Sequence, residues 1–266
     1  MEIVIITEGL SLFSAITEMN VRAGWSIAFV FTAGVSIRSV LNQANILPKL
    51  LQEIRAEINK LLKSGWALKL IVGILILQAA VLLAIIFIYP IPNDYDSMTY
   101  HLARIIYWDQ QGNLAHFASH DLRQITFPPF AEYALLNARF LMGSDSVTRL
   151  IQWFSMVVAM IGVTEITKKL GGNSLQRAMS ALLTASIPMG IMQATTTQND
   201  YVLAAWTVCL VVFGLATLQN ISNPWSVGAV GVALGLMMLT KGTGYIYALP
   251  FGIWFIYRML RTFGWQ

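Results

Sequence analysis

The sequence predicts an all-α, polytopic membrane protein. Of its 266 residues, 56% are hydrophobic and only 11% are charged, whereas soluble domains carry about 25% charged residues. Apolar runs alternate with short polar connections along most of the chain. Such runs are stable in hydrocarbon as helices, which satisfy their own backbone hydrogen bonds. We therefore expect about six to eight transmembrane or re-entrant helices and a long first outer loop that carries juxtamembrane helices.

The N-terminal region, residues 1–69, differs from the rest of the chain. Residues 3–17 and 23–37 are apolar but shorter than the about 20 residues that a spanning helix needs. They form either two tilted short spans or a re-entrant hairpin. Residues 38–69 combine basic side chains with Leu and Ile at helical spacing, which predicts a basic amphipathic helix on the cytoplasmic membrane surface or an ordinary cytosolic linker helix. The basic positions are Arg38, Lys49, Arg55, Lys60, Lys63 and Lys69, and the apolar positions are Leu47, Leu50, Leu51, Ile54, Ile58, Leu61 and Leu62.

The predicted transmembrane core, residues 70–266, opens with the clearest span. The run 70–92 carries no charge and ends at Pro90 and Pro92, because proline cannot continue the hydrogen bonds of a helix. A long polar connection, residues 93–146, follows it. Five further apolar runs come next, at about 147–166, 178–194, 201–218, 225–240 and 244–257.

Lysine and arginine predict the orientation, because they collect in cytoplasmic loops. The basic segment 38–69 places the long polar connection on the outer side. If each later apolar run crosses the membrane once, Lys168–Arg177, Arg258 and Arg261 lie on the cytoplasmic side. Lys241 is the exception, since an isolated outer lysine between apolar runs is costly unless it is used or snorkels. We expect a multi-pass protein of the plasma (inner) membrane whose active site faces the non-cytoplasmic side.

Polar stretches from distant parts of the chain converge on the predicted outer side. They are Asp94 with Asp96, the run 195–200, and Lys241. A carboxylate can accept the proton of an attacking hydroxyl, and cations can hold a phosphate and stabilise charge on a leaving phosphate. The combination indicates a transferase that works at a membrane surface. The alternative is that these groups are ordinary helix caps and interfacial charges.

An amphipathic helix is predicted directly after Asp96. Tyr100, Arg104 and Trp108 are four residues apart and therefore share one face of it. This helix would lie at the membrane interface. Arg104 would then bind either a lipid phosphate or the bilayer surface.

The rest of the polar connection holds a double proline and the three histidines. Pro128-Pro129 requires extended backbone before it, and Glu132 then begins an apolar helix that runs to Met142. His101, His116 and His120 lack the close spacing typical of metal ligands. We therefore expect no cofactor, and a divalent cation is possible but not indicated.

Other features exclude some function classes. The net charge of +4 does not suggest nucleic acid as a partner. No glycine-rich nucleotide cradle is present, which is consistent with a donor linked to lipid rather than to a nucleotide. Cys209 is the single cysteine, so no intramolecular disulfide can form.

The stretch that begins with Asp94 and Asp96, here called the acidic stretch, resembles a motif of the polyprenyl-phosphate-dependent GT-C-fold glycosyltransferases. This group includes the protein O-mannosyltransferases and the aminoarabinose transferases. They carry Asp-Glu followed shortly by Tyr in the first outer loop, and here Asp96 and Tyr100 match the Asp and the Tyr. Ser97 stands where Glu is common, which leaves Asp94 as its substitute.

Later motifs follow the same order as in that group. Pro128-Pro129 matches a double proline that opens an outer-side helix, with Phe127 where some relatives have Lys. Asp200 matches an outer-loop aspartate at a helix start, and Lys241 matches a lysine in a glycine-containing turn. The resemblance covers about residues 70–257.

The resemblance implies transfer of a sugar from a polyprenyl-phosphate donor to an unknown acceptor of the cell envelope. Asp96 would be the general base or would orient the acceptor, with Asp94 as the second catalytic candidate. Donor-phosphate candidates are Arg104, Arg123 and Lys241, and Asp200 would position donor or acceptor. The full set of expected substrate-binding residues is Tyr100, His101, Arg104, Arg123, Glu132, Asn199, Asp200 and Lys241.

Two alternatives to an active transferase stay open. Relatives usually continue with more spans and often an outer domain, so the resemblance implies that residues 70–266 are a partial core. The chain would then be a fragment, a truncated product or a minimal member, and a non-catalytic fragment or assembly subunit is one alternative. A transporter or flippase-like protein would use Asp96, Asp200 and Lys241 as substrate or ion contacts. Transporters place such sites near the bilayer midplane, often between inverted repeats, and no repeat is evident here.

Overall fold

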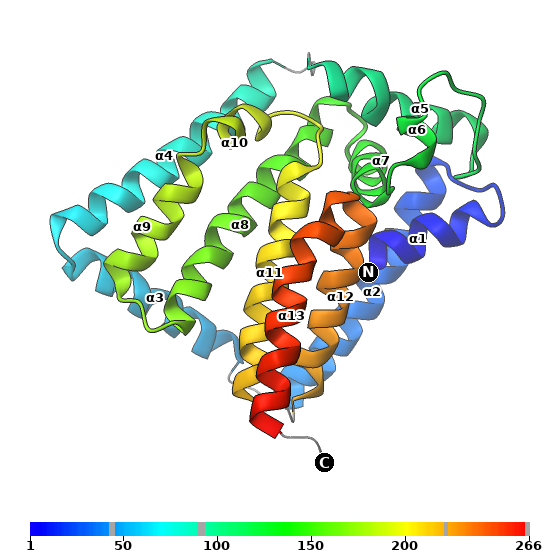
Figure 1. Cartoon of the computed structure of the whole chain (residues 1–266). Helices are drawn as coiled ribbons and strands as arrows, with labels where there is room; N and C mark the ends of the chain where they lie inside the picture. The colour runs from blue at the N-terminus through cyan, green and yellow to red at the C-terminus, as the bar shows by residue number, and fades with distance from the viewer. Residues whose placement is uncertain (43–45, 90–93, 221–222, 264–266) are drawn as a thin grey trace.

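The computed structural model describes the backbone of residues 1–42, 46–89, 94–220 and 223–263. Within these ranges all regular structure is helical, which confirms the predicted class (Figure 1). Some expectations fall outside this description. They concern Pro90, Pro92 and Asn93, and the side chains of Arg38, Leu47 and Leu50.

Three helices of the described residues are long and apolar enough to cross a membrane. They are α4 (Trp66–Ile88), α8 (Leu150–Lys169) with the 3₁₀ turn before it, and α11 (Asp200–Gln219). The apolar helix α12 (Pro224–Thr240) is shorter, and α13 (Thr243–Phe263) contains a proline in its interior. The chain is thus a helical membrane protein, as predicted.

The helix α11 lies in the middle of this bundle, between α8 and the α12–α13 pair (Figure 1). Its backbone comes close to α8, because a side chain at Gly162 would overlap Val208. Small residues allow such close helix packing in membranes, where dispersion contacts replace the hydrophobic effect between helices. Buried Leu82, Met156 and Tyr201 then join α4, α8 and α11 into one apolar core.

The run 178–194, expected as one span, is divided in the structure. Helix α9 (Ser174–Ala185) stops before Pro188, and a separate short helix, α10 (Pro188–Gln193), follows. Ile187 is extended, as the residue before a proline must be, so the helix cannot continue through it. Hydropathy alone does not register this break, because the residues on both sides of it are apolar.

The N-terminal helices pack on the helix that follows the double proline. Helices α1 (Glu2–Ser11) and α2 (Glu18–Asn42) contact α7 (Phe130–Met142), as Figure 1 shows at the right of the molecule. Trp25 Nε1 donates to Asn137 Oδ1 over 2.8 Å. At about 1.5 Å per residue, the 10 residues of α1 are too short to cross a bilayer, so residues 3–17 are not a span of their own.

The predicted amphipathic helix is present as α3 (Ile46–Lys63). Its apolar side chains Leu51, Ile54, Ile58 and Leu62 are all exposed, by 49% or more. The side chains are therefore not buried in a protein core, which fits a helix that lies on a membrane surface. Its location on the cytoplasmic side stays a prediction.

The long polar connection forms a helical cap at the other end of the bundle. After a π-helical turn (Ser97–His101) come α5 (Leu102–Gln111), α6 (Arg123–Thr126) and α7. Helix α7 is confirmed as the apolar helix predicted to run to Met142. In Figure 1 this cap lies near the top together with α10, whereas α3 and the α8–α9 turn lie near the bottom.

Candidate active site

The structure brings the acidic stretch and the run 195–200 into direct contact. The backbone N–H of Thr197 donates to Ser97 Oγ over 3.1 Å, and both residues are fully buried. Gln198 Nε2 donates to Asp94 Oδ1 over 3.3 Å. The predicted convergence of these two segments is therefore confirmed by their hydrogen bonds.

Asp94 holds the turn that presents its neighbours. Its carboxylate accepts from the backbone N–H of Ser97 over 2.9 Å and from the Ser97 hydroxyl over 2.5 Å. The turn is a π-helix, in which the N–H of Leu102 donates to the carbonyl of Ser97 five residues earlier. Such turns occur often at functional sites. Asp94 thus acts structurally here, and its predicted catalytic role stays a prediction.

Asp96 lies on the outside of the same turn, with 39% of its side chain exposed. Arg123 Nη1 contacts Asp96 Oδ1 at 3.3 Å. The guanidinium is held by Asp121, which accepts from Nη2 over 2.7 Å and from Nε over 2.9 Å. Hydrogen bonds from Arg123 keep the pKa of Asp121 below its usual value. Arg123 therefore lies fixed beside Asp96 rather than free in solvent.

Lys241 forms an ion pair with the residue that begins α11. Its Nζ lies 2.7 Å from Asp200 Oδ1, and the two side chains are 30% and 38% exposed. The neighbouring Asn199 is buried and donates to the carbonyl of Thr240 over 3.2 Å. These contacts join the α12–α13 turn to the start of α11. Lys241, the lysine that the sequence predicts on the outer side, thus has an acidic partner.

Tyr100 is a buried side chain of the same turn as Asp96. The Arg123 guanidinium stacks 4.5 Å from the centre of its ring. The pKa of the Tyr100 phenol is raised well above its ordinary value, first by burial and then by the charge of Asp96, while Arg123 opposes the rise and Glu132 and Asp200 add to it. Tyr100 therefore stays a neutral phenol beside Arg123 and Asp96.

Behind Tyr100 is a buried charged cluster. His101 Nδ1 lies 2.7 Å from Glu132 Oε1, and both side chains are fully buried. Arg104 Nη1 lies 4.0 Å from Glu132 Oε2. Among the described residues, His101 Nε2 and Glu132 Oε2 have no hydrogen-bond partner. Contact of His101 and Glu132 with a substrate, which the resemblance implies, stays a prediction.

Arg104 lies inside the cap and not on the bilayer surface. Its guanidinium stacks 4.6 Å from the centre of the Trp108 ring, as expected for side chains four residues apart. Its Nη1 donates to the carbonyl of Phe127 over 2.8 Å, at the residue before the double proline. Burial lowers the pKa of Arg104, and the charge of Glu132 opposes that effect. Arg104 thus holds the Pro128-Pro129 corner in place.

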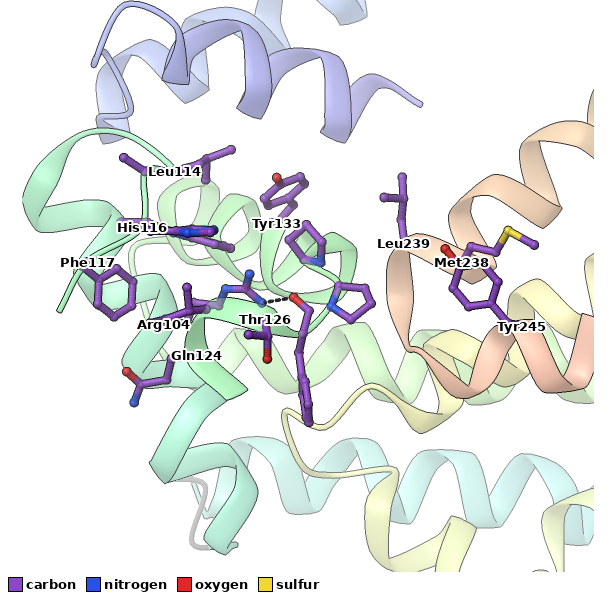
Figure 2. A pocket seen from close by; sticks show the side chains of 16 residues that line it. Arg104, Leu114, His116, Phe117, Gln124, Thr126, Tyr133, Met238, Leu239 and Tyr245 are labelled. Atoms are coloured by element: carbon purple, nitrogen blue, oxygen red, sulfur yellow. Dashed lines mark hydrogen bonds between the residues drawn. The ribbon is translucent and has the colours of Figure 1, made fainter. Parts of the chain in front are cut away.

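A polar pocket of about 360 Å³ opens beside this corner. Figure 2 shows Arg104 and Thr126 on one side and Met238, Leu239 and Tyr245 on the other. Phe127 lines the pocket and also meets the Tyr100 ring edge-on, with the centroids 5.6 Å apart. The pocket and the Asp96–Tyr100 group therefore share a wall.

The family described as dolichyl-phosphate-mannose-protein mannosyltransferase matches residues 127–264, which is more than half of the chain. The chain belongs to this family. No curated protein and no solved structure matches it. Membership confirms the suspected GT-C resemblance and identifies a membrane glycosyltransferase.

The match to the mannosyltransferase family covers one half of the site directly. The matched residues include Pro128-Pro129, Glu132, Asp200 and Lys241. The segment Asp94–His101, which we call the acidic turn, precedes them. The turn is tied to the matched part by the hydrogen bonds from Thr197 to Ser97 and from Gln198 to Asp94. The contact of His101 with Glu132 adds a further link. The two halves of this mannosyltransferase-family site are therefore one structural unit.

Sequence patterns did not indicate three residues that support the site. Asp121 precedes Arg123 by two positions, a spacing that could have indicated their pairing. Gln152 accepts from the backbone N–H groups of Tyr201 and Val202 over 2.9 and 3.2 Å, so it caps α11 from α8. Arg149 is buried and donates to the carbonyls of Ile86 and Tyr89 at the end of α4. Gln152 and Arg149 sit in or beside an apolar run and gave no local signal.

The described residues contain no group of three or more His, Cys, Asp or Glu side chains placed to hold a metal ion. His116 lines the polar pocket, next to Phe117.

Proposed function

We propose that the chain transfers a sugar from a polyprenyl-phosphate donor to an acceptor hydroxyl at the non-cytoplasmic membrane face, with inversion at the sugar carbon. The observation that carries this proposal is the buried hydrogen bond from Thr197 to Ser97, which joins the turn that carries Asp96 to the segment that ends at Asp200. Asp96, 39% exposed, and the Lys241–Asp200 ion pair therefore lie at the same end of the bundle. A base and a phosphate-binding cation are the two groups that the reaction needs.

Asp96 is the proposed general base. An inverting displacement needs a carboxylate on the face of the sugar opposite the leaving phosphate. Arg123 contacts Oδ1 of Asp96, so Oδ2 is available to an acceptor hydroxyl. Arg123 uses its other donors on Asp121 and Thr99, which supports a role in orienting Asp96 over a role as the main phosphate ligand.

Lys241 is the proposed ligand of the donor phosphate. An ammonium group has three donors, and Asp200 occupies one of them. The remaining two can bind phosphate oxygens and stabilise the charge that develops as the phosphate leaves. Asp200 would keep the lysine aimed at the site, and Arg104 would support the pocket wall through Phe127.

An apolar groove near the double proline suits the polyprenyl chain of the donor. A groove of about 610 Å³ runs between α7, α8 and α11, and almost all of its surface is apolar. It begins at Phe130, directly after the double proline, and reaches Phe154 and Trp206. A donor with its phosphate near Lys241 could place its lipid tail along this groove, within the bilayer.

The direct test uses purified protein in sealed proteoliposomes with polyprenyl-phosphate mannose and matched donors that carry other sugars. We expect release of polyprenyl phosphate, loss of that release in Asp96→Asn, and a product of inverted anomeric configuration. Full release by Asp96→Asn would remove the base assignment. Donor that is moved across the bilayer without cleavage would favour the transporter instead.

A further inference from the structure

A second charged crevice lies at the end of the bundle opposite the candidate active site. It is formed mainly by α3, α4 and α9, at the left of Figure 1. The crevice has a volume of about 300 Å³ and adjoins a wider hollow of about 850 Å³. Glu57, Lys60, Ser174 and Arg177 line both. The part of α4 from Leu75, which lines the crevice, to Ile88 separates it from the acidic turn, a rise of about 20 Å at 1.5 Å per residue.

The mouth of the crevice is rich in cations. Segments 46–69 and 165–177 together contain eight Lys and Arg residues but three Glu residues. Lys60 pairs with Glu57 at 2.7 Å, and Lys168 lies 3.6 Å from Glu165. Arg177 differs, because its guanidinium makes no hydrogen bond or ion pair to any described residue, and its Nε is buried. A buried, unsatisfied cationic donor is costly unless a ligand satisfies it.

The charges of three elements meet at this mouth. The pKa of Glu57 is lowered, first by the hydrogen bond and charge of Lys60 and then by the charges of Arg177 and Lys168. These cations come from α3, α9 and α8 respectively. Lys60, Lys168 and Arg177 all line the wider hollow, so an anion at the mouth would be attracted by all three cations.

The inner wall of the crevice is apolar. Leu68, Val72 and Leu75 of α4 face Ala178 and Ala181 of α9. The small side chains of Ala178 and Ala181 leave room between α9 and α4. Helix α4 is long and apolar enough to cross the membrane. A ligand that fits must therefore carry a negative head and a hydrocarbon tail.

We propose that this crevice binds an anionic phospholipid, with its phosphate at Arg177, Lys168 and Lys60 and an acyl chain along α4 and α9. Basic pockets between membrane helices bind the head groups of anionic lipids, whose charge is concentrated in the cytoplasmic leaflet. The positive-inside prediction puts this end of the bundle in that leaflet. The site is separate from the proposed donor site and does not rest on the proposed function.

Native mass spectrometry of the detergent-solubilised protein tests this proposal, with phosphatidylglycerol and phosphatidylcholine of identical acyl chains as probes. We expect tighter binding of phosphatidylglycerol. Arg177→Gln should weaken it about fivefold, and adding Lys168→Gln should weaken it further, since each charge near a lipid surface contributes a factor of about five. Glu57→Gln should strengthen it, because it removes the carboxylate at the mouth.

The matched control is Arg258→Gln, the same change at an exposed arginine of α13. It should leave phosphatidylglycerol binding unchanged. Should Arg177→Gln fail to fold, Lys60→Gln changes a side chain that is 71% exposed and tests the same mouth. Equal binding of the two lipids, or equal losses in Arg177→Gln and Arg258→Gln, would overturn the proposal. Displacement of the lipid by millimolar glycerol 1-phosphate would also overturn it, because the apolar wall would then contribute nothing.

Discussion

The backbone N–H of Thr197 donates a hydrogen bond to the Ser97 hydroxyl, although the two residues are 100 positions apart in the chain. Both residues are fully buried, and Asp94 fixes the serine from the other side. This contact places the start of α11, with Asp200, next to the turn that carries Asp96. The site therefore depends on one buried junction between two polar segments, and the predictions below concern the groups that this junction positions.

Asp96→Asn should reduce donor cleavage by about 10²- to 10⁴-fold, the usual contribution of a general base. The change removes the acceptor of the hydroxyl proton but keeps the shape of the side chain. Thermal stability should change little, because exposed ion pairs contribute at most about 1 kcal/mol. The control is Asp109→Asn, which breaks an ion pair with Arg139 at similar exposure, 33%, elsewhere in the cap. Equal activity of the two variants would argue against a catalytic Asp96.

Lys241→Gln should lower kcat/KM for the donor by about 10- to 100-fold, which corresponds to a charge-assisted hydrogen bond of about 1.5–3 kcal/mol. Combining it with Asp200→Asn should cost less than the product of the two single effects, since Asp200 acts through the lysine. Steady-state kinetics with varied donor measure both. Lys69→Gln, at an exposed lysine of α4, is the matched control. Independent, multiplicative effects would contradict the proposed pairing.

Glu132→Ala should destabilise the protein by about 3–5 kcal/mol, because it leaves His101 and Arg104 buried without their acidic partner. The loss should appear as a lower thermal midpoint in detergent. Glu18→Ala removes an ion pair with Arg22 that is about half exposed, and we expect a change below about 1 kcal/mol there. Similar midpoints for the two variants would show that the buried cluster does not stabilise the cap.

Asp121→Asn should reveal a pH-dependent contribution. The pKa of Asp121 is lower in the folded protein than in the unfolded chain, where it is about 3.9. The pair with Arg123 therefore stabilises the fold above that pH, and the contribution is lost as the pH falls through the folded-state value. From pH 7 to 5 the free energy of unfolding of the wild type should exceed that of the variant by at most about 1 kcal/mol, because the pair is near the surface.

Denaturant titrations of both proteins at several pH values measure this difference. The two should become equally stable at the acid end. A difference that persists or grows below pH 3 would show that Asp121 contributes through packing rather than through charge.

Local patterns predicted most of the helices and the order of the polar groups. The helix with Arg104 above Trp108, and α7 after the double proline, follow from spacing and from proline stereochemistry, which act over a few residues. The partners of Arg123 and Lys241 did not follow from such patterns. Their pairing with Asp121, Asp96 and Asp200 depends on where whole helices lie, and hydropathy carries no information about that.

The sequence by itself determined that this is an all-helical membrane protein with acids and a lysine at the ends of its apolar runs. It could do so because hydropathy, charge bias and proline geometry are sums over neighbouring residues. The tertiary structure decided that His101 and Glu132 are buried together, that Arg123 is held beside Asp96, and that Thr197 bonds to Ser97. These contacts join residues 31, 27 and 100 positions apart, and only the packed bundle brings such residues together.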